Sequence, residues 1–137
     1  TRHLADCTLD EVRAEDFDML ILPGGQPGTN NLRGDLRIRK MIETLVEKKR
    51  PIAALCAAPL VLSDHGLLIH HQATCHPSVR SELKAAQFSA DRVVVDGNII
   101  TSQAAGTAME FAFQLVEILC GKEKVAEVNR GVLARLS

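Results

Sequence analysis

Short runs of continuous apolar residues alternate along the chain with segments whose apolar residues recur every three or four positions. Residues 18–22 and 51–55 are such runs, each beside a Pro or Gly stop, and they predict buried parallel strands. Residues 35–49 have a helical repeat with charges on the other face, which predicts an amphipathic helix with a solvated face rather than a nucleic-acid surface. Its apolar positions are Ile38, Met41, Ile42, Leu45 and Val46.

The second half of the chain continues this alternation. Residues 92–95 and 98–101 flank Asp96-Gly97 and predict a hairpin. Residues 107–120 predict a helix that is buried on most sides, with Thr107 and Glu110 at capping-box spacing. Further helices are expected over residues 57–63, 77–86 and 122–136, with a loop over residues 23–34 and a short strand ending at Thr74-Cys75. Strands alternating with helices predict a layered α/β fold with a mostly parallel sheet.

Composition narrows the class of protein. The 137 residues are enough for one domain, and the 46% of hydrophobic residues can form a core. A net charge of -1 and an aromatic content of 3% provide no argument for binding to nucleic acid or to an anionic membrane. No apolar run reaches the roughly 18 residues of a membrane span. The four cysteines form no CxxC pair, so reduced thiols in a cytoplasmic protein are expected.

Cys56 lies where the strand over residues 51–55 meets the following helix. Ala54, Ala57 and Ala58 surround it with small side chains, and a nucleophile on a sharp strand-to-helix turn needs such neighbours. The unpaired N–H groups at the start of the helix would favour a thiolate over a thiol. The alternative is a buried structural cysteine, because free cysteines are among the most buried residues.

Three strand ends are expected to meet at one crevice, because sites in open α/β sheets lie beyond the carboxyl ends of the strands. Gly24 and Gly25 follow the first strand, Cys56 the second and His76 the third. His76 could activate the sulfur as a base or orient it, or it could only cap the helix after it. The N–H groups of Gly25 and Ala57 could form an oxyanion hole, although Gly24-Gly25 could also be an ordinary turn.

Metal and phosphate sites are not expected. The Gly-rich stretch lacks the phosphate-loop pattern. A group of His and Cys residues lies within residues 65–76, but its spacing matches no zinc pattern, so neither a metal nor another cofactor is predicted. Cys75 adjoins His76 and is expected to be a packing residue, pointing away from it. The group comprises His65, His70, His71, Cys75 and His76.

Four segments resemble a known family when they are taken together. They are Leu22-Pro23-Gly24-Gly25, residues 52–59 around Cys56, Thr74-Cys75-His76-Pro77, and residues 101–111. In this order and spacing they resemble the ThiJ/PfpI superfamily, and within it the branch of the human Parkinson-disease protein deglycase/chaperone. The resemblance implies a flavodoxin-like three-layer sandwich, a homodimer, and a reactive cysteine and nearby histidine at Cys56 and His76. It also implies oxyanion-type amides at Gly25 and Ala57, with Gly24 lining the pocket.

Two features depart from that family. Gln103-Ala104-Ala105-Gly106 stands where the branch often has Arg-Gly-Pro-Gly, so a substrate or dimer contact attributed to that Arg is not expected to carry over to this chain. The resemblance also implies an earlier strand and helix that carry a protonated Glu. Residues 1–137 would then be the C-terminal part of a single domain. We therefore expect this piece not to fold alone, and an N-terminal segment of the same protein to complete it, either as a cleaved chain or as further sequence.

The expected function is a cysteine-dependent, stress-protective activity on reactive carbonyls or glycated adducts, as in a glyoxalase or deglycase. The alternative is an oxidation-sensing redox chaperone without turnover. A cysteine peptidase or amidase is a weaker alternative, because it needs a third residue to orient His76 and the sequence indicates none.

Overall fold

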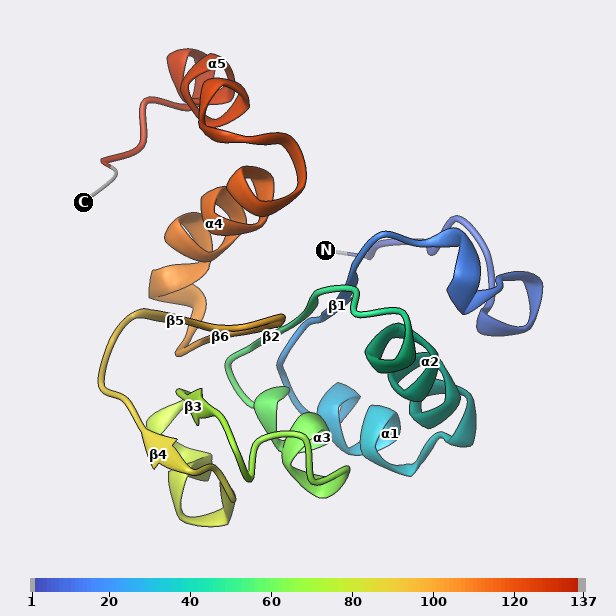
Figure 1. Cartoon of the computed structure of the whole chain (residues 1–137). Coiled ribbons are helices and arrows are strands. Elements are labelled where there is room, and N and C mark those ends of the chain that lie inside the picture. Colours follow the sequence, from blue (N-terminus) through green and yellow to red (C-terminus); the bar gives the residue numbers. More distant parts are fainter. Residues whose placement is uncertain (1, 136–137) are drawn as a thin grey trace.

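A four-stranded sheet lies at the centre of the computed structural model, which describes residues 2–135. The strands follow the order β1 (Leu20–Leu22), β2 (Ile52–Leu55), β6 (Ile99–Ser102) and β5 (Val93–Asp96). β1, β2 and β6 are parallel, and β5 pairs antiparallel with β6. Helices lie on both sides of this sheet (Figure 1). The expected flavodoxin-like three-layer sandwich with a mostly parallel sheet is confirmed.

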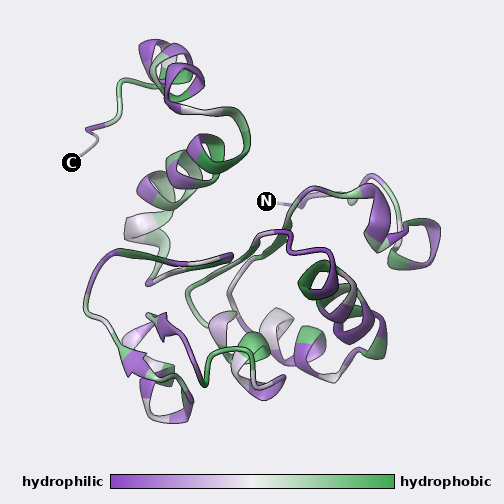
Figure 2. Ribbon diagram, viewed as in Figure 1, coloured by the Kyte–Doolittle hydropathy of each residue, from purple (hydrophilic) through white to green (hydrophobic). Residues whose placement is uncertain are grey.

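The alternation of β2 side chains between the two faces of the sheet builds two hydrophobic cores. Ile52 and Ala54 face α2 (Leu36–Glu47) and α3 (Pro59–Asp64), in a cluster that includes Ile42. Ala53 faces the other way, with Ile100, and packs against α4 (Ala108–Cys120). All four of these β2 and β6 side chains are buried, in agreement with the apolar runs. α2 shows one hydrophobic and one hydrophilic side (Figure 2).

The stretch over residues 23–34 is not a loop throughout, because α1 (Gly28–Gly34) forms within it. Its composition of Gly, Thr and Asn is poor for helix propensity, so tertiary contacts decide the conformation. Thr29 is fully buried, and Leu32 packs against the core. Arg33 makes hydrogen bonds of 2.6 and 3.2 Å to the carboxylate of Asp64 in α3. The loop prediction is therefore wrong for these residues.

The third predicted strand lies outside the central sheet. β3 (Gln72–Ala73) pairs with β4 (Gln87–Phe88) in a separate two-stranded sheet, because β6 takes the place beside β2. The helix expected over residues 77–86 is shorter, a 3-10 helix η3 (Pro77–Glu82). Two more short 3-10 helices, η1 (Leu9–Glu11) and η2 (Ala14–Asp16), precede the sheet.

α4 differs from its prediction in two respects. Only Phe111, Phe113 and Leu115 are buried in it, and its last turns are exposed. The capping box of Thr107 and Glu110 does not form. The Thr107 hydroxyl instead donates to the carbonyl of Ala104, within the short 3-10 helix η4 (Ala105–Thr107) that precedes α4, and Glu110 pairs with Arg92. After Gly121, α5 (Lys122–Val132) lies against α4 on the same side of the sheet (Figure 1).

Among the helices of residues 2–135, none is long and apolar enough to cross a membrane.

Candidate active site

Cys56 lies at the turn that leads from β2 into α3. Its φ of 63° is in the left-handed region, which L-residues other than Gly, Asn and Asp seldom adopt. Backbone bonds hold it on both sides: its N–H donates to the carbonyl of Ser102 at 3.0 Å, and its carbonyl accepts from the N–H of His76 at 2.8 Å. The thiol is free and half-buried. This is the geometry of a strained turn that presents a side chain at the end of a sheet.

Gly24 packs directly against Cys56. A Cβ built at Gly24 would come within 2.6 Å of the Cβ of Cys56 and 2.7 Å of the carbonyl oxygen of Leu55. No real Cβ tolerates such distances, so only glycine fits here. The parallel register of Leu22 with Ala54 brings the two strand ends to this approach. The expected meeting of the first two strand ends is thus observed.

Gly25 and Ala57 are the residues that follow Gly24 and Cys56 in the chain, and their backbone amides are the predicted oxyanion-hole donors. Gly25 has a φ of 89°, a conformation that suits glycine. The hydrogen bonds recorded among residues 2–135 include none donated by the N–H of Gly25 or of Ala57. Within the described residues both amides lack a protein acceptor, and their role as an oxyanion hole stays a prediction.

His76 reaches Cys56 from outside the central sheet. Its backbone N–H bonds Cys56, as described above, while its ring begins η3 as a cap: Nδ1 accepts from the N–H of Ser78 at 3.1 Å. The hydroxyl of Ser78 lies 2.8 Å from the same Nδ1. The cap expected as one alternative is thus present, and Ser78 is a partner of the ring that sequence reasoning missed. The sequence feature that could have identified Ser78 is Pro77. A proline at the first helical position makes His76 the N-cap, and the backbone N–H of Ser78 then points toward the cap residue.

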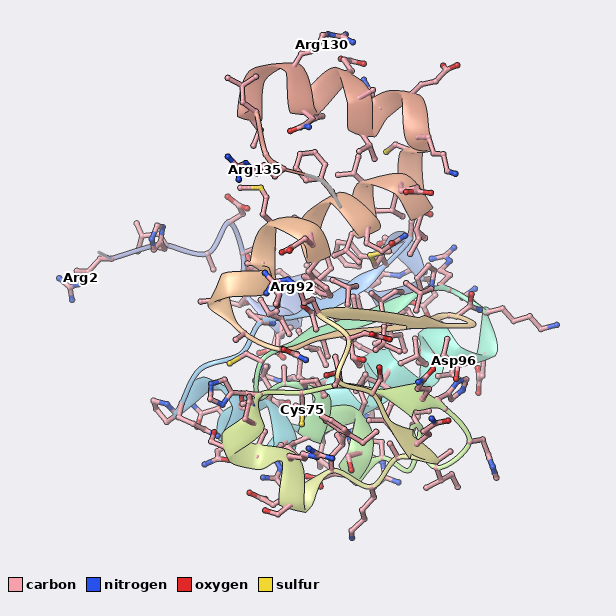
Figure 3. All side chains as sticks on the ribbon, turned by 90° about the vertical axis from the view of Figure 1, so that its left-hand side faces the viewer. Arg2, Cys75, Arg92, Asp96, Arg130 and Arg135 are labelled. Carbon is pink, nitrogen blue, oxygen red and sulfur yellow. The ribbon has the colours of Figure 1, made fainter. Side chains whose placement is uncertain are left out.

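Cys75 is the second thiol near the turn. It is buried, as expected for a packing residue, and Figure 3 labels it on the lower part of the molecule. Burial raises the pKa of the Cys75 thiol to about 11, with a partly opposing effect of Arg80 and a small further increase from Cys56. Cys75 is thus a neutral thiol at ordinary pH.

Gln103 occupies the place where an Arg was expected from the family pattern. Its side-chain amide donates to the carbonyls of Ala90 and Asp91, at 2.7 and 3.1 Å. The residue thereby fixes the segment between β4 and β5 to the end of β6. Its role in this chain is a backbone clamp.

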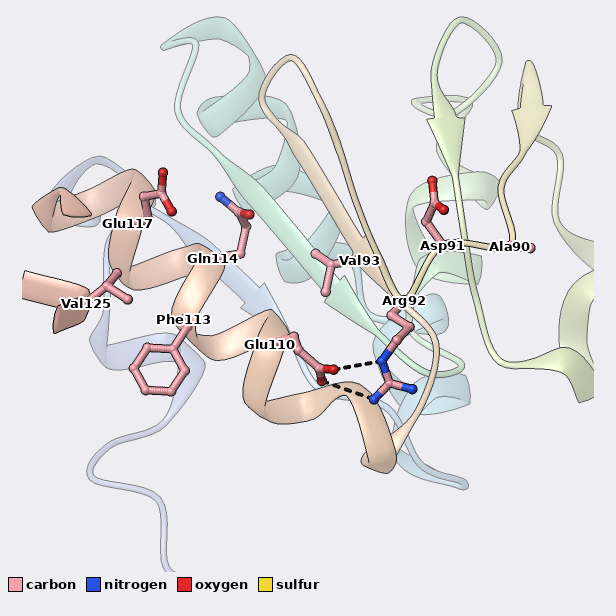
Figure 4. Close-up of a pocket in the computed structure, with 9 residues that line it drawn as sticks. All are labelled: Ala90, Asp91, Arg92, Val93, Glu110, Phe113, Gln114, Glu117 and Val125. Atoms are coloured by element: carbon pink, nitrogen blue, oxygen red, sulfur yellow. Dashed lines mark hydrogen bonds and ion pairs between the residues drawn. The ribbon is translucent and has the colours of Figure 1, made fainter. Parts of the chain in front are cut away.

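A cavity of about 500 Å³ lies apart from these residues, between β5, α4 and α5. Arg92, Glu110, Phe113 and Val125 are among its lining residues (Figure 4), and Cys56 and His76 are not. The guanidinium of Arg92 is already bound by the Glu110 carboxylate, at 2.7 and 3.2 Å, and by the carbonyl of Gly106. A charge paired in this way is poorly placed to recognise a ligand, so we assign the candidate active site to the Cys56 turn.

The His and Cys residues within residues 65–76 do not converge on one point. In the part of the chain that the structure describes, no group of three or more His, Cys, Asp or Glu side chains could hold a metal ion. His71 instead lies 3.5 Å from the carboxylate of Asp96.

Comparison with known proteins identifies the family. Residues 1–118 match the model of the DJ-1/PfpI family, and the chain belongs to that family. The protein dj-1beta of Drosophila melanogaster is 40% identical over 132 residues, which are 95% of this chain and 71% of that relative. The glutathione-independent glyoxalase DJR-1.2 of Caenorhabditis elegans is 38% identical over 125 residues, 90% of this chain and 66% of the relative.

Two solved structures share the fold of this chain, at sequence identities of 38% and 33%. The crystal structure of Drosophila melanogaster DJ-1beta superimposes with a TM-score of 0.92 at 38% identity, covering 99% of this chain and 74% of that one. Oxidized Toxoplasma gondii DJ-1 superimposes with a TM-score of 0.90 at 33% identity, covering 96% of this chain and 72% of that one.

Two Arabidopsis thaliana relatives, DJ-1 homologs A and B, are longer than this chain. The chain spans about a third of their length, 33% and 30%.

Proposed function

We propose that this protein removes reactive carbonyl compounds through nucleophilic attack by Cys56, as a glyoxalase- or deglycase-like enzyme of the cytoplasm that acts as a homodimer. The observation that carries the proposal is the Cys56 turn. A strained backbone is retained there although it costs of order 1–3 kcal/mol, and it presents a half-buried thiol. The relative named as a glutathione-independent glyoxalase supports the same chemistry.

The proposed substrates are carbonyl compounds because a thiolate adds to an electrophilic carbonyl carbon. Addition of the thiolate to an aldehyde carbon forms a carbon–sulfur bond and moves the carbonyl electron pair onto oxygen. The developing oxyanion needs hydrogen-bond donors, and the amides of Gly25 and Ala57 are candidates for that role. For a 2-oxoaldehyde the net reaction is addition of water with an internal transfer of hydrogen to give a 2-hydroxy acid. It needs no external oxidant or reductant.

The test compares methylglyoxal consumption by the full protein with that of Cys56→Ala. Loss of turnover by more than about 10³-fold is expected for removal of a nucleophile. Cys120→Ser is the matched control, because Cys120 is an exposed thiol at the end of α4. Equal consumption by the native protein and Cys56→Ala would contradict the proposal.

A redox chaperone without turnover is the second candidate function. The observation in its favour is that Cys56 is free and partly accessible, together with a solved relative described in its oxidized form. Under that function, peroxide would oxidise Cys56, and the oxidised protein would suppress aggregation of an unfolded client. Cys56→Ala would then lose the peroxide dependence of this suppression, and neither protein would consume methylglyoxal enzymatically.

A further inference from the structure

The ring of His76 is held by the residue two positions after it. Ser78 approaches Nδ1 twice, through its backbone N–H at 3.1 Å and through its hydroxyl at 2.8 Å. Pro77 between them begins η3, so the helical backbone sets the direction of the Ser78 N–H. His76 therefore caps η3 through a ring nitrogen, where Ser, Asp or Asn usually supply an oxygen.

The backbone contact favours one position of the ring proton, whereas the Ser78 hydroxyl can donate or accept and does not distinguish the two tautomers. A backbone amide nitrogen can only donate, so Nδ1 must offer its lone pair to it. In the neutral ring the proton is then on Nε2. The opposite tautomer would bring an N–H of the ring against the N–H of Ser78 and lose the cap.

The same histidine is fixed to the turn that carries the candidate nucleophile. Its backbone N–H donates to the carbonyl of Cys56 at 2.8 Å, and its side chain is half-buried. The hydrogen bonds recorded for residues 2–135 include none from Nε2 of His76. The ring thus has one nitrogen engaged by Ser78 and a second, Nε2, with no protein partner among the described residues.

We propose that Ser78 is a positioning residue that holds His76 as the Nε2–H tautomer, so that His76 serves the Cys56 site as a hydrogen-bond donor and not as the base for the thiol. An Nε2–H group can donate to the sulfur or to a substrate oxygen. It has no lone pair with which to take the thiol proton. The tautomer can be measured without any turnover, whereas its catalytic consequence rests on the proposed function.

Nitrogen NMR of the histidine rings in the full protein tests the tautomer without any turnover. The expected result for the native protein is a neutral His76 ring with the proton on Nε2 alone. His70 is exposed and provides an internal reference for an unconstrained ring. A protonated Nδ1 in neutral His76, or a pattern that matches His70, would overturn the proposal.

Two substitutions of Ser78 separate the amide from the hydroxyl. Ser78→Ala keeps the backbone N–H, and the Nε2–H tautomer should persist. Ser78→Pro removes the donor at a position in the first helical turn, where proline is tolerated, and the His76 pattern should approach that of His70. An unchanged pattern in Ser78→Pro, or a lost one in Ser78→Ala, would contradict the assignment of the amide. If Ser78→Pro fails to fold, the native protein and Ser78→Ala still decide the question.

Two amide replacements of His76 test the catalytic consequence. His76→Gln places an N–H donor near the position of Nε2, whereas His76→Asn replaces only the Nδ1 side of the ring. A donor role predicts that kcat/KM falls less than about tenfold in His76→Gln and about 10²–10³-fold in His76→Asn. Equal losses in both, with loss of the acidic limb of the pH profile, would show a base and overturn the proposal. Retained turnover in Cys56→Ala would instead contradict the proposed function and leave the NMR result intact.

Discussion

Gly24 approaches Cys56 so closely that a methyl group on Gly24 would overlap the Cβ of Cys56, at 2.6 Å. The carbonyl oxygen of Leu55 lies equally near, at 2.7 Å. Because Leu55 contributes backbone, the overlap cannot be relieved by rotating one flexible side chain. The end of β1 and the turn after β2 therefore constrain each other, and a substitution at Gly24 also alters the surroundings of the candidate nucleophile, Cys56.

Gly24→Ala is expected to displace the Cys56 turn. Overpacking of this kind costs about 1–3 kcal/mol, and the rate of Cys56 alkylation should change with it. The measurements are chemical denaturation and mass-spectrometric labelling of the Cys56 peptide. Gly28→Ala is the control, because nothing lies within 4 Å of a Cβ there. Equal stability and labelling in the two variants would show that the close approach is not a constraint.

The left-handed conformation of Cys56 predicts a conflict between stability and function. Cys56→Gly should be more stable than Cys56→Ala by about 1 kcal/mol, since alanine keeps the Cβ that disfavours a φ of 63° and glycine does not. Thermal unfolding of the two variants measures the difference. If Cys56→Ala were the more stable of the two, the turn would not be strained.

Burial of Cys75 predicts selective thiol chemistry. Since its pKa is raised to about 11, it should resist iodoacetamide at pH 8, while the exposed Cys7 and Cys120 react. Between pH 9.0 and about pH 11, the Cys75 thiol of the unfolded chain loses its proton while that of the folded protein keeps it. The free energy of unfolding should therefore fall as the pH rises through this range. Peptide mapping after labelling measures the iodoacetamide reaction of each cysteine. Labelling of Cys75 at the rate of Cys7 would contradict it.

Asp35 predicts a loss of stability in acid. It caps α2 by accepting from the N–H of Arg37 at 2.8 Å, and the Arg37 guanidinium lowers the pKa of this carboxyl to about 2. Its contribution is fully present above its ordinary value of 3.8 and is lost as pH falls through about 2.

Asp35→Asn keeps an acceptor at the cap but cannot titrate. Its melting temperature, followed by circular dichroism, should therefore fall less than that of the native protein between pH 4 and about 2. An identical fall in both proteins would show that Asp35 does not contribute to the acid response. Asp35→Ala, which lacks the acceptor, should be less stable than Asp35→Asn across the whole range.

Much of the fold could be predicted from local pattern. The apolar runs of residues 18–22 and 51–55 contain β1 and β2, and the Asp96-Gly97 hairpin joins β5 to β6. The α/β class follows from their alternation with helices. The helix of residues 28–34 could not be predicted in this way, because the burial of Thr29 and the Arg33–Asp64 contact overcome its weak propensity. The exposed end of α4 was missed for a related reason, since apolar content alone does not show which face is covered.

The residue types along the chain are enough to identify the members of the candidate site: small residues around Cys56, glycines after β1 and a histidine before Pro77. How these residues meet depends on the folded chain. The parallel register of β1 and β2 places Gly24 against Cys56, and a single backbone bond brings His76 to the turn from outside the central sheet. The fold also sets the direction of the His76 ring, through the hydrogen bond from the backbone N–H of Ser78. The residue types show which chemical groups the chain has. Proton positions and close approaches depend on distances between segments that are far apart in the sequence, and local sequence patterns do not predict those distances.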